Sequence, residues 1–271
     1  NVQAIGRVLP FDILDIRSSI YQQLKGIGSS MQISEETYYS EAVTHLRENL
    51  ALALRAASKH GLAEGVCNHF SLELPDQSGR FLLNPRGLLW EEVFADDVVL
   101  INENGDVLAG KHPVEPTAMF IHSAIHRICK KVCVLHTHMP NATALSLTKH
   151  GKLDTKLSQS AMRFHGRVSA DTQYSGLALD VSEGERIARA MNGRDIVFLG
   201  NHGVVVCADR MDYAYDDLYY LERACELEVL ARSTGQELVG VSEDLAQKVS
   251  DETLQDRLQS ELFFKALRRT M

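Results

Sequence analysis

The chain has 271 residues, of which 45% are hydrophobic and 24% are charged, and its formal net charge at pH 7 is −8. These proportions are typical of a globular protein and exclude an intrinsically disordered chain. The negative charge predicts no nucleic-acid partner, because phosphate binding requires a basic surface. No apolar run reaches the roughly 18 residues that span a bilayer, so no membrane association is expected.

The N-terminal residues predict an arm and not a signal peptide. Asn1 to Arg17 lacks a basic stretch followed by an apolar core. The five cysteines show no CxxC spacing, and Cys207 and Cys225 lie in apolar contexts where reduced thiols are common. We therefore expect a cytoplasmic protein with an N-terminal arm over residues 1–33.

A long amphipathic helix is predicted to begin at Ser34, which would cap it, and to end near His60. The segment from Asn68 to Asn84 then predicts a β-hairpin. Its two halves are rich in strand-forming apolar residues, and the sequence that begins at Pro75 between them is typical of a turn.

The next predicted elements are two short strands and a helix. A strand at 98–101 precedes the turn signal Asn104-Gly, and a second short strand follows at 107–108. Thr117 is expected to cap a helix that runs to about Lys130.

The rest of the chain mixes apolar strands with helical patterns. The predicted elements are a strand at 132–138, a helix at 140–149, a strand at 195–199 that continues after an interruption through 204–207, and helices at 212–234 and 242–267. Such a mixture predicts α/β layers and leaves the strand order open. We assign residues 34–240 to one main domain and 241–271 to a C-terminal helical tail.

Three histidines give the strongest functional signal. His136 and His138 are separated by one residue at the end of a predicted strand, so both imidazoles project to the same face. Alone, this pair could be two half-buried histidines with satisfied hydrogen bonds. His202 offers a third ligand from an Asn-His-Gly sequence, in which Gly203 permits a backbone conformation that aims it inward. Together they predict one divalent metal, with zinc first and manganese, iron or cobalt as alternatives.

Short motifs between Ser40 and Gln236 add a family resemblance. They are Asn68-His-Phe-Ser, Asn84-Pro-Arg-Gly, Ile121-His-Ser-Ala-Ile-His, His136-Thr-His, Gln159-Ser-Ala-Met-Arg-Phe-His-Gly and Asn201-His-Gly. In this order they resemble the class II aldolase and adducin head-domain family. The resemblance implies an α/β fold, a three-layer αβα sandwich with a mostly antiparallel central sheet. It also implies that the three histidines hold the metal, in a homotetramer with sites near subunit interfaces.

The sequence departs from the sugar-phosphate members of that family. Those members carry an acidic residue four positions before the helix histidine that matches His122, where this chain has Ala118. Their phosphate-binding serines are missing as well, and Arg86-Gly87 replaces the usual Ser/Thr-Gly pair. Glu115 is the nearest acid, either as a catalytic proton carrier or as a solvated loop carboxylate. These departures argue against a phosphorylated sugar as the substrate.

Several other residues are candidates for the site. Substrate contacts are expected from Asn68, Ser71, Gly87, Arg163 and His165, and support of the metal ligands from His122 and Asn201. Each has a structural alternative. Arg163 could hold a substrate carboxylate bidentately or form an ordinary ion pair, and Ser71 could bond only to the hairpin backbone.

The sequence therefore predicts a metal-dependent aldehyde-lyase or decarboxylase that acts on a small, non-phosphorylated, oxygenated or carboxylated substrate. Two alternatives stay open. One is an adducin-head-like binding or assembly module without catalysis, which the missing acid at Ala118 suggests. The other is a non-haem iron enzyme that uses the same three histidines. The presence of all three favours an enzyme.

Overall fold

The computed structural model describes residues 35–75 and 77–271, so the predicted arm and Ser34 lie outside the described residues. Its strands are β1 (His69–Glu73), β2 (Arg80–Leu83), β3 (Val99–Asn102), β4 (Val107–Ala109), β5 (Cys133–Thr137), β6 (Val168–Asp171), β7 (Ile196–Leu199) and β8 (Gly203–Ala208). They form one sheet in the order β4-β3-β2-β1-β5-β8-β7-β6. All neighbours pair antiparallel except β6 and β7, which confirms the predicted α/β class and the mostly antiparallel sheet.

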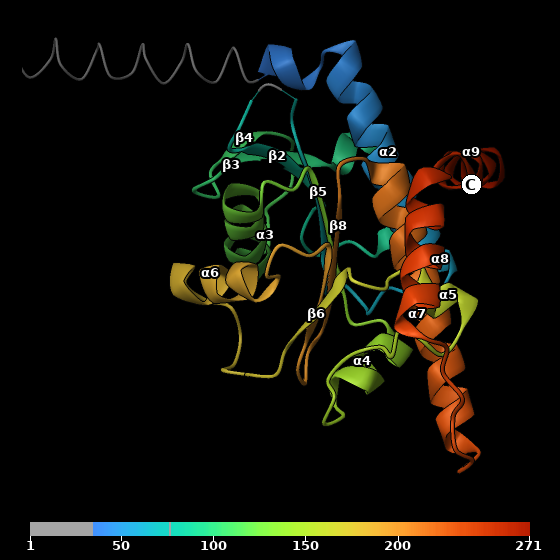
Figure 1. Cartoon of the computed structure of the whole chain (residues 1–271). Coiled ribbons are helices and arrows are strands. Elements are labelled where there is room, and N and C mark those ends of the chain that lie inside the picture. The colour runs from blue at the N-terminus through green and yellow to red at the C-terminus, as the bar shows by residue number, and fades with distance from the viewer. Residues whose placement is uncertain (1–34, 76) are drawn as a thin grey trace, which may run out of the picture.

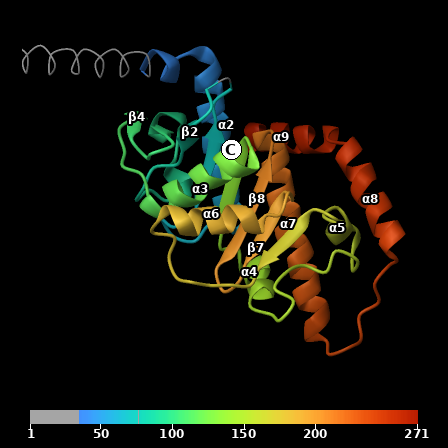
Figure 2. The same cartoon turned by 60° about the vertical axis from the view of Figure 1, so that its left-hand side comes forward.

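Helices cover both faces of the sheet. They are α2 (Glu41–Lys59), α3 (Pro116–Cys129), α4 (Pro140–Ser146), α5 (Gln159–Met162), α6 (Val181–Ala190), α7 (Met211–Ser233), α8 (Glu243–Gln255) and α9 (Leu258–Thr270), with 3-10 turns at Trp90–Glu92 and Ala95–Asp97. Figures 1 and 2 show α3 and α6 on one face and α2, α7 and α9 on the other. This is the three-layer sandwich that the resemblance implied.

Alternation along β5 separates the two larger of the three apolar clusters. Val134 packs with residues of α3 and α6, whereas Leu135 packs with residues of α2 and α7. His136 shares the side of Val134, since side chains two residues apart project to the same face of a strand. The strand therefore directs His136 towards the α3 side of the sheet.

The first predicted helix is interrupted in the structure. Residues 35–38 are helical, and after a break Ser40 is the N-cap of α2, with its hydroxyl accepting from the Val43 amide at 3.4 Å. At α3 the prediction is also wrong by two residues. Glu115 and not Thr117 occupies the N-cap, because Pro116 fits the first helical position, where no amide hydrogen is needed.

The segment around Asn201 forms a hairpin and not one continued strand. β7 and β8 pair antiparallel, so the chain reverses between Leu199 and Gly203. β6, which no sequence pattern predicted, pairs parallel with β7. The predicted helix at 140–149 ends at Ser146, and the predicted helix at 242–267 is two helices, interrupted after Gln255.

The last helix, α9, packs against α2 and α7. Phe264 and Leu267 of α9 are buried in the larger apolar core, beside α2 and α7. Across residues 35–75 and 77–271, no helix combines the length and the apolar character needed to cross a bilayer.

Candidate metal centre

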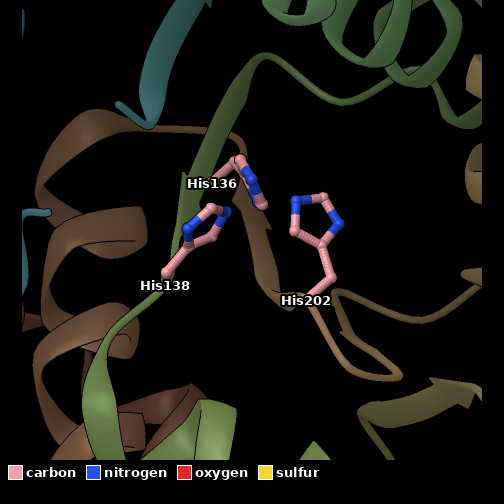
Figure 3. A group of neighbouring side chains, drawn as sticks. All are labelled: His136, His138 and His202. Atoms are coloured by element: carbon pink, nitrogen blue, oxygen red, sulfur yellow. The ribbon is translucent and has the colours of Figure 1, made fainter. Parts of the chain in front are cut away.

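Three histidines converge at the end of the central strands. His136 lies on β5, His138 directly follows it, and His202 lies on the turn between β7 and β8 (Figure 3). The ring centroid of His202 lies 4.8 Å from the centroid of His136 and 4.8 Å from that of His138. The centroids of His136 and His138 are 5.0 Å apart. One ligand atom of each residue lies within 4.8 Å of the other two. The structure thus brings the three predicted ligands together.

The β7–β8 turn places His202 through two small residues. Asn201 takes the left-handed conformation, with φ at 58°. Gly203 is needed for close approach, because a Cβ there would lie 2.5 Å from the Thr137 carbonyl oxygen and 2.8 Å from Cδ2 of His138. Glycine is thus required at this position for space and not for a left-handed backbone, because Gly203 is not among the residues with positive φ.

Two acceptors orient the strand ligands. Nδ1 of His136 lies 2.9 Å from the Val204 carbonyl oxygen, and Nδ1 of His138 lies 2.5 Å from a carboxylate oxygen of Glu64. Both contacts require a proton on Nδ1, because a carbonyl or carboxylate oxygen only accepts. Each neutral ring then keeps its Nε2 lone pair for a metal, an arrangement common among metal-binding histidines.

These acceptors differ from the predicted supporting residues. Asn201 is exposed and takes no part in these two contacts. His122 does not contact the ligands through a hydrogen bond but bonds to His69, whose ring packs 4.9 Å from that of His136.

The chemistry of the group fits a divalent metal. Nε2 of His138 is buried without a hydrogen-bond partner among the described residues. Burial, with the neighbouring histidines, lowers the pKa of His136 well below its usual value, and burial lowers the pKa of His202 to about 4. Neutral imidazole is the form that binds metal. Three such ligands suit zinc, and also manganese, iron or cobalt, and leave positions open for a substrate.

Asn68, a predicted substrate contact, lies beside the ligand His138. It adopts a left-handed conformation with φ at 73°, and its amide oxygen accepts from the His138 backbone at 3.2 Å. The Nδ2 group of this buried side chain has no hydrogen-bond partner among the described residues. Asn68 therefore offers an unused donor next to the metal ligands.

Three other predicted site residues have different surroundings. Glu115 forms an ion pair with Arg86 at 2.8 Å, and Gly87 is exposed with φ at 86°. Ser71 is fully buried, and its hydroxyl is already hydrogen-bonded to His122 and His126.

Arg163 and His165 join helices within the chain. The guanidinium of Arg163 pairs with Asp216 and lies 4.0 Å from the ring centroid of Tyr220. Nε2 of His165 lies 2.9 Å from a carboxylate oxygen of Glu243 on α8. The structure thus shows the ion-pair alternative for Arg163.

Sequence patterns missed two residues that touch the ligands. Glu64 lies 74 positions before His138, and no local pattern connects them. His69 stands directly opposite His136 in the β1–β5 pairing. His69 and Ser71 are two residues apart on the predicted hairpin strand, so they share one face of it, and this spacing could have indicated His69.

The amino-acid sequence is similar to those of known proteins. The family described as Class II Aldolase and Adducin N-terminal domain matches residues 48–229. A Pseudomonas aeruginosa protein named after the class 2 aldolases is 31% identical over 214 residues, which cover 78% of this chain and 81% of that protein. An adducin-related protein of Schizosaccharomyces pombe is 31% identical over 199 residues, covering 68% and 58% of the two chains.

Solved structures show the same architecture. An aldolase II superfamily protein from Pseudomonas syringae superposes with a TM-score of 0.80 at 30% identity, covering 88% of this chain and 96% of that one. An L-fuculose 1-phosphate aldolase from Glaciozyma antarctica gives a TM-score of 0.74 at 23% identity, covering 84% and 90%. This second likeness is one of fold alone.

Proposed function

Because the chain belongs to the class II aldolase and adducin family, we propose that it is a metal-dependent lyase that breaks a carbon–carbon bond of a small oxygenated or carboxylated substrate. The observation that carries the proposal is the convergence of three imidazoles, two of them oriented by acceptors on Nδ1. A divalent metal bound there supplies a Lewis acid for retro-aldol or decarboxylative cleavage.

The chain's own residues would orient the substrate and stabilise charge. Glu64 and the Val204 carbonyl fix the direction of His138 and His136. The Nδ2 group of Asn68, which has no partner among the described residues, would donate to an oxygen that gains negative charge when the bond breaks. A fixed donor in a buried site stabilises such charge more than water does, since it needs no reorientation.

Glu115 is our candidate for the proton transfer. Its carboxylate is partly exposed and is paired with Arg86, so transfer requires that this ion pair opens. Replacement by glutamine is expected to lower kcat by about 10²- to 10⁴-fold while the metal content stays the same. A Glu115→Gln variant with the turnover of the unmodified chain would remove Glu115 from the mechanism.

Metal analysis tests the proposal directly. We expect about one zinc, manganese, iron or cobalt per chain, in accord with the three ligands that converge. The His136→Ala and His202→Ala variants should lose the metal and any lyase activity, whereas His150→Ala, at an exposed histidine, should keep both. Turnover that persists in a metal-free His136→Ala variant would contradict the proposed function.

A second candidate is a non-catalytic binding or assembly module of the adducin type. Rat alpha-adducin is 28% identical over 204 residues, which cover 72% of this chain and 27% of that protein. Ala118, where sugar-phosphate aldolases carry an acid, is fully buried in a small apolar cluster with Phe81 and Val99. A purified chain that takes up no metal on titration would favour this module.

The same preparations address two further proposals. Turnover that requires oxygen would identify a non-haem iron enzyme, which anaerobic and aerobic assays separate. A homotetramer in the cytoplasm, with metal sites near subunit interfaces, remains our expectation for the assembly. Light scattering of the purified chain should then give about four times the 30.2 kDa of one chain.

A further inference from the structure

A buried chain of hydrogen bonds runs between β1 and α3, next to the metal ligands. Nδ1 of His69 lies 2.8 Å from Nε2 of His122, whose Nδ1 lies 2.5 Å from the Ser71 hydroxyl. That hydroxyl also lies 2.7 Å from Nε2 of His126, whose Nδ1 lies 2.6 Å from the Lys131 carbonyl oxygen. The four linked side chains are buried, so their polar atoms must hydrogen-bond to one another and not to water.

The protons of this chain have only one consistent order when its histidines are neutral. The neutral form is favoured because all three rings are buried and their hydrogen-bond partners are a hydroxyl, a carbonyl and one another, with no carboxylate among them. The Lys131 carbonyl can only accept, so Nδ1 of His126 carries that ring's proton. Its bare Nε2 then takes the single hydroxyl proton of Ser71.

The same reasoning continues towards the metal ligands. Because the Ser71 proton is already used, Nδ1 of His122 must donate to the Ser71 oxygen. Nε2 of His122 is then bare, and Nδ1 of His69 must donate to it. The order therefore ends with an unprotonated Nε2 on His69.

The position of His69 shows where this nitrogen acts. His69 pairs with His136 across the β1–β5 ladder, and the two rings lie 4.9 Å apart on the same face of the sheet. Nδ1 of His69 points to His122 on α3, so Nε2 faces away from that helix. His69 does not belong to the group of three converging ligands. The His69 ring thus lies beside one of the metal ligands and outside the ligand set.

We propose that His69 is a substrate-binding residue whose bare Nε2 accepts a hydrogen bond from a hydroxyl group of the metal-bound substrate. His122, Ser71 and His126 are positioning residues that fix the tautomer of His69. This inference rests on the proposed function and adds a substrate class. The substrate carries a hydroxyl group in addition to the oxygens that meet the metal.

Nitrogen-15 NMR identifies which ring nitrogen of each histidine carries the proton. The sample is the whole chain, labelled at its histidines and treated with zinc. We expect His69, His122 and His126 to be protonated at Nδ1 and bare at Nε2. A His69 ring protonated at Nε2 would overturn the proposal. This measurement needs no turnover and no variant, so it separates the inference from the proposed function, which fails only if the chain takes up no metal or has no activity.

The Ser71→Ala variant cuts the chain of hydrogen bonds and tests the positioning role. It should give a mixture of His69 tautomers, since His122 is no longer fixed by the hydroxyl. The His150→Gln variant, at an exposed histidine, should leave the His69 signal unchanged. A single, unchanged His69 tautomer in Ser71→Ala would refute the role of Ser71.

Two matched ligands test the substrate contact. Glycerate and lactate share an α-hydroxy carboxylate, and glycerate has one more hydroxyl group. Calorimetry on the zinc-loaded chain should show about 5- to 10-fold tighter binding of glycerate, the effect of one hydrogen bond. In His69→Phe this preference should disappear while the zinc content stays the same. No preference in the unmodified chain, or a preference that persists in His69→Phe, would overturn the proposal.

Discussion

Replacing Glu64 by alanine removes the carboxylate that lies 2.5 Å from Nδ1 of His138. The ring then loses the acceptor that fixes its orientation, and we expect the metal affinity to fall by about 10- to 100-fold. Competition with a coloured chelator measures this loss. Glu237→Ala, at an exposed glutamate, should show the affinity of the unmodified chain. Equal affinities in both variants would mean that Glu64 does not orient the ligand.

Gly203→Ala places a methyl group where no space exists. The new Cβ would lie 2.5 Å from the Thr137 carbonyl oxygen and 2.8 Å from the His138 ring, so that ring must move. We expect a loss of about 1–3 kcal/mol in the free energy of unfolding, together with weaker metal binding. Gly240→Ala is the matched control, because its Cβ would meet only Lys156 at 3.6 Å. Metal binding that survives in Gly203→Ala would show that the turn adapts.

At the level of residues, local spacing predicted part of the site. His136 and His138 follow from the two-residue period of a strand, and His202 from its Asn-His-Gly turn. Glu64 contacts His138 only because the loop after α2 folds over the end of β5, which no local pattern encodes. The role of Arg163 could not be predicted from local spacing, because its partner, Asp216, lies far along the sequence.

At the level of elements, buried charges attach the C-terminal helices to α7. Asp217 is fully buried on α7 and accepts from Arg167 at 2.6 Å and from Arg257, between α8 and α9, at 2.9 Å. Asp217→Ala leaves two guanidinium groups without this partner, so we expect a loss of about 3–5 kcal/mol in the free energy of unfolding. Urea denaturation measures it.

An exposed ion pair provides the comparison for Asp217. Glu226 pairs with Arg223 on the surface of α7, and such pairs contribute about 0–1 kcal/mol. Glu226→Ala should therefore unfold almost as the unmodified chain does. If Asp217→Ala is no less stable than Glu226→Ala, the buried network does not attach the C-terminal helices.

Strong local patterns also predicted most elements. The hairpin of β1 and β2 combines strand-forming halves with a turn sequence, and both agreed with the structure. The first predicted helix is interrupted because Ser40, a good cap inside the predicted span, begins α2 there. β6 was missed because its four residues, Val168–Asp171, carry polar groups on a strand that pairing to β7 stabilises.

At the level of the whole molecule, acid should unfold the protein partly through Asp217. Burial would raise the pKa of this carboxyl, but Arg167 and Arg257 outweigh that effect and hold it below the usual value. A carboxyl with a lowered folded pKa stabilises the fold above its unfolded pKa, about 3.9, and loses this contribution as the pH falls through the folded value. Asp216 has the opposite effect on the pH dependence of stability, because burial raises its pKa above the usual value.

Thermal unfolding between about pH 6 and pH 2 tests this dependence, a range that brackets the carboxyl pKa. The midpoint Tm of the unmodified chain should fall below about pH 4, and that of Asp217→Asn should fall less, since the variant has no carboxyl to protonate at this position. Parallel curves for the two proteins would show that Asp217 does not couple stability to pH.

Metal binding should also stabilise the whole fold. A ligand that binds only the folded chain adds about 2.7 kcal/mol at a free concentration of 100 times its Kd. Zinc should therefore raise the Tm of the unmodified chain and leave that of His202→Ala unchanged. A similar rise in both proteins would indicate zinc binding outside the three histidines.

The placement of the three ligands has a kinetic consequence. β5 lies between β1 and β8, so His136 stands on an interior strand that pairs on both sides and opens only when the sheet itself unfolds. His202 belongs to a short reverse turn, a kind of segment that moves on a faster timescale. An incoming ion would therefore meet two preassembled nitrogens first and be enclosed by the third, so capture would proceed without refolding and release would begin at the turn.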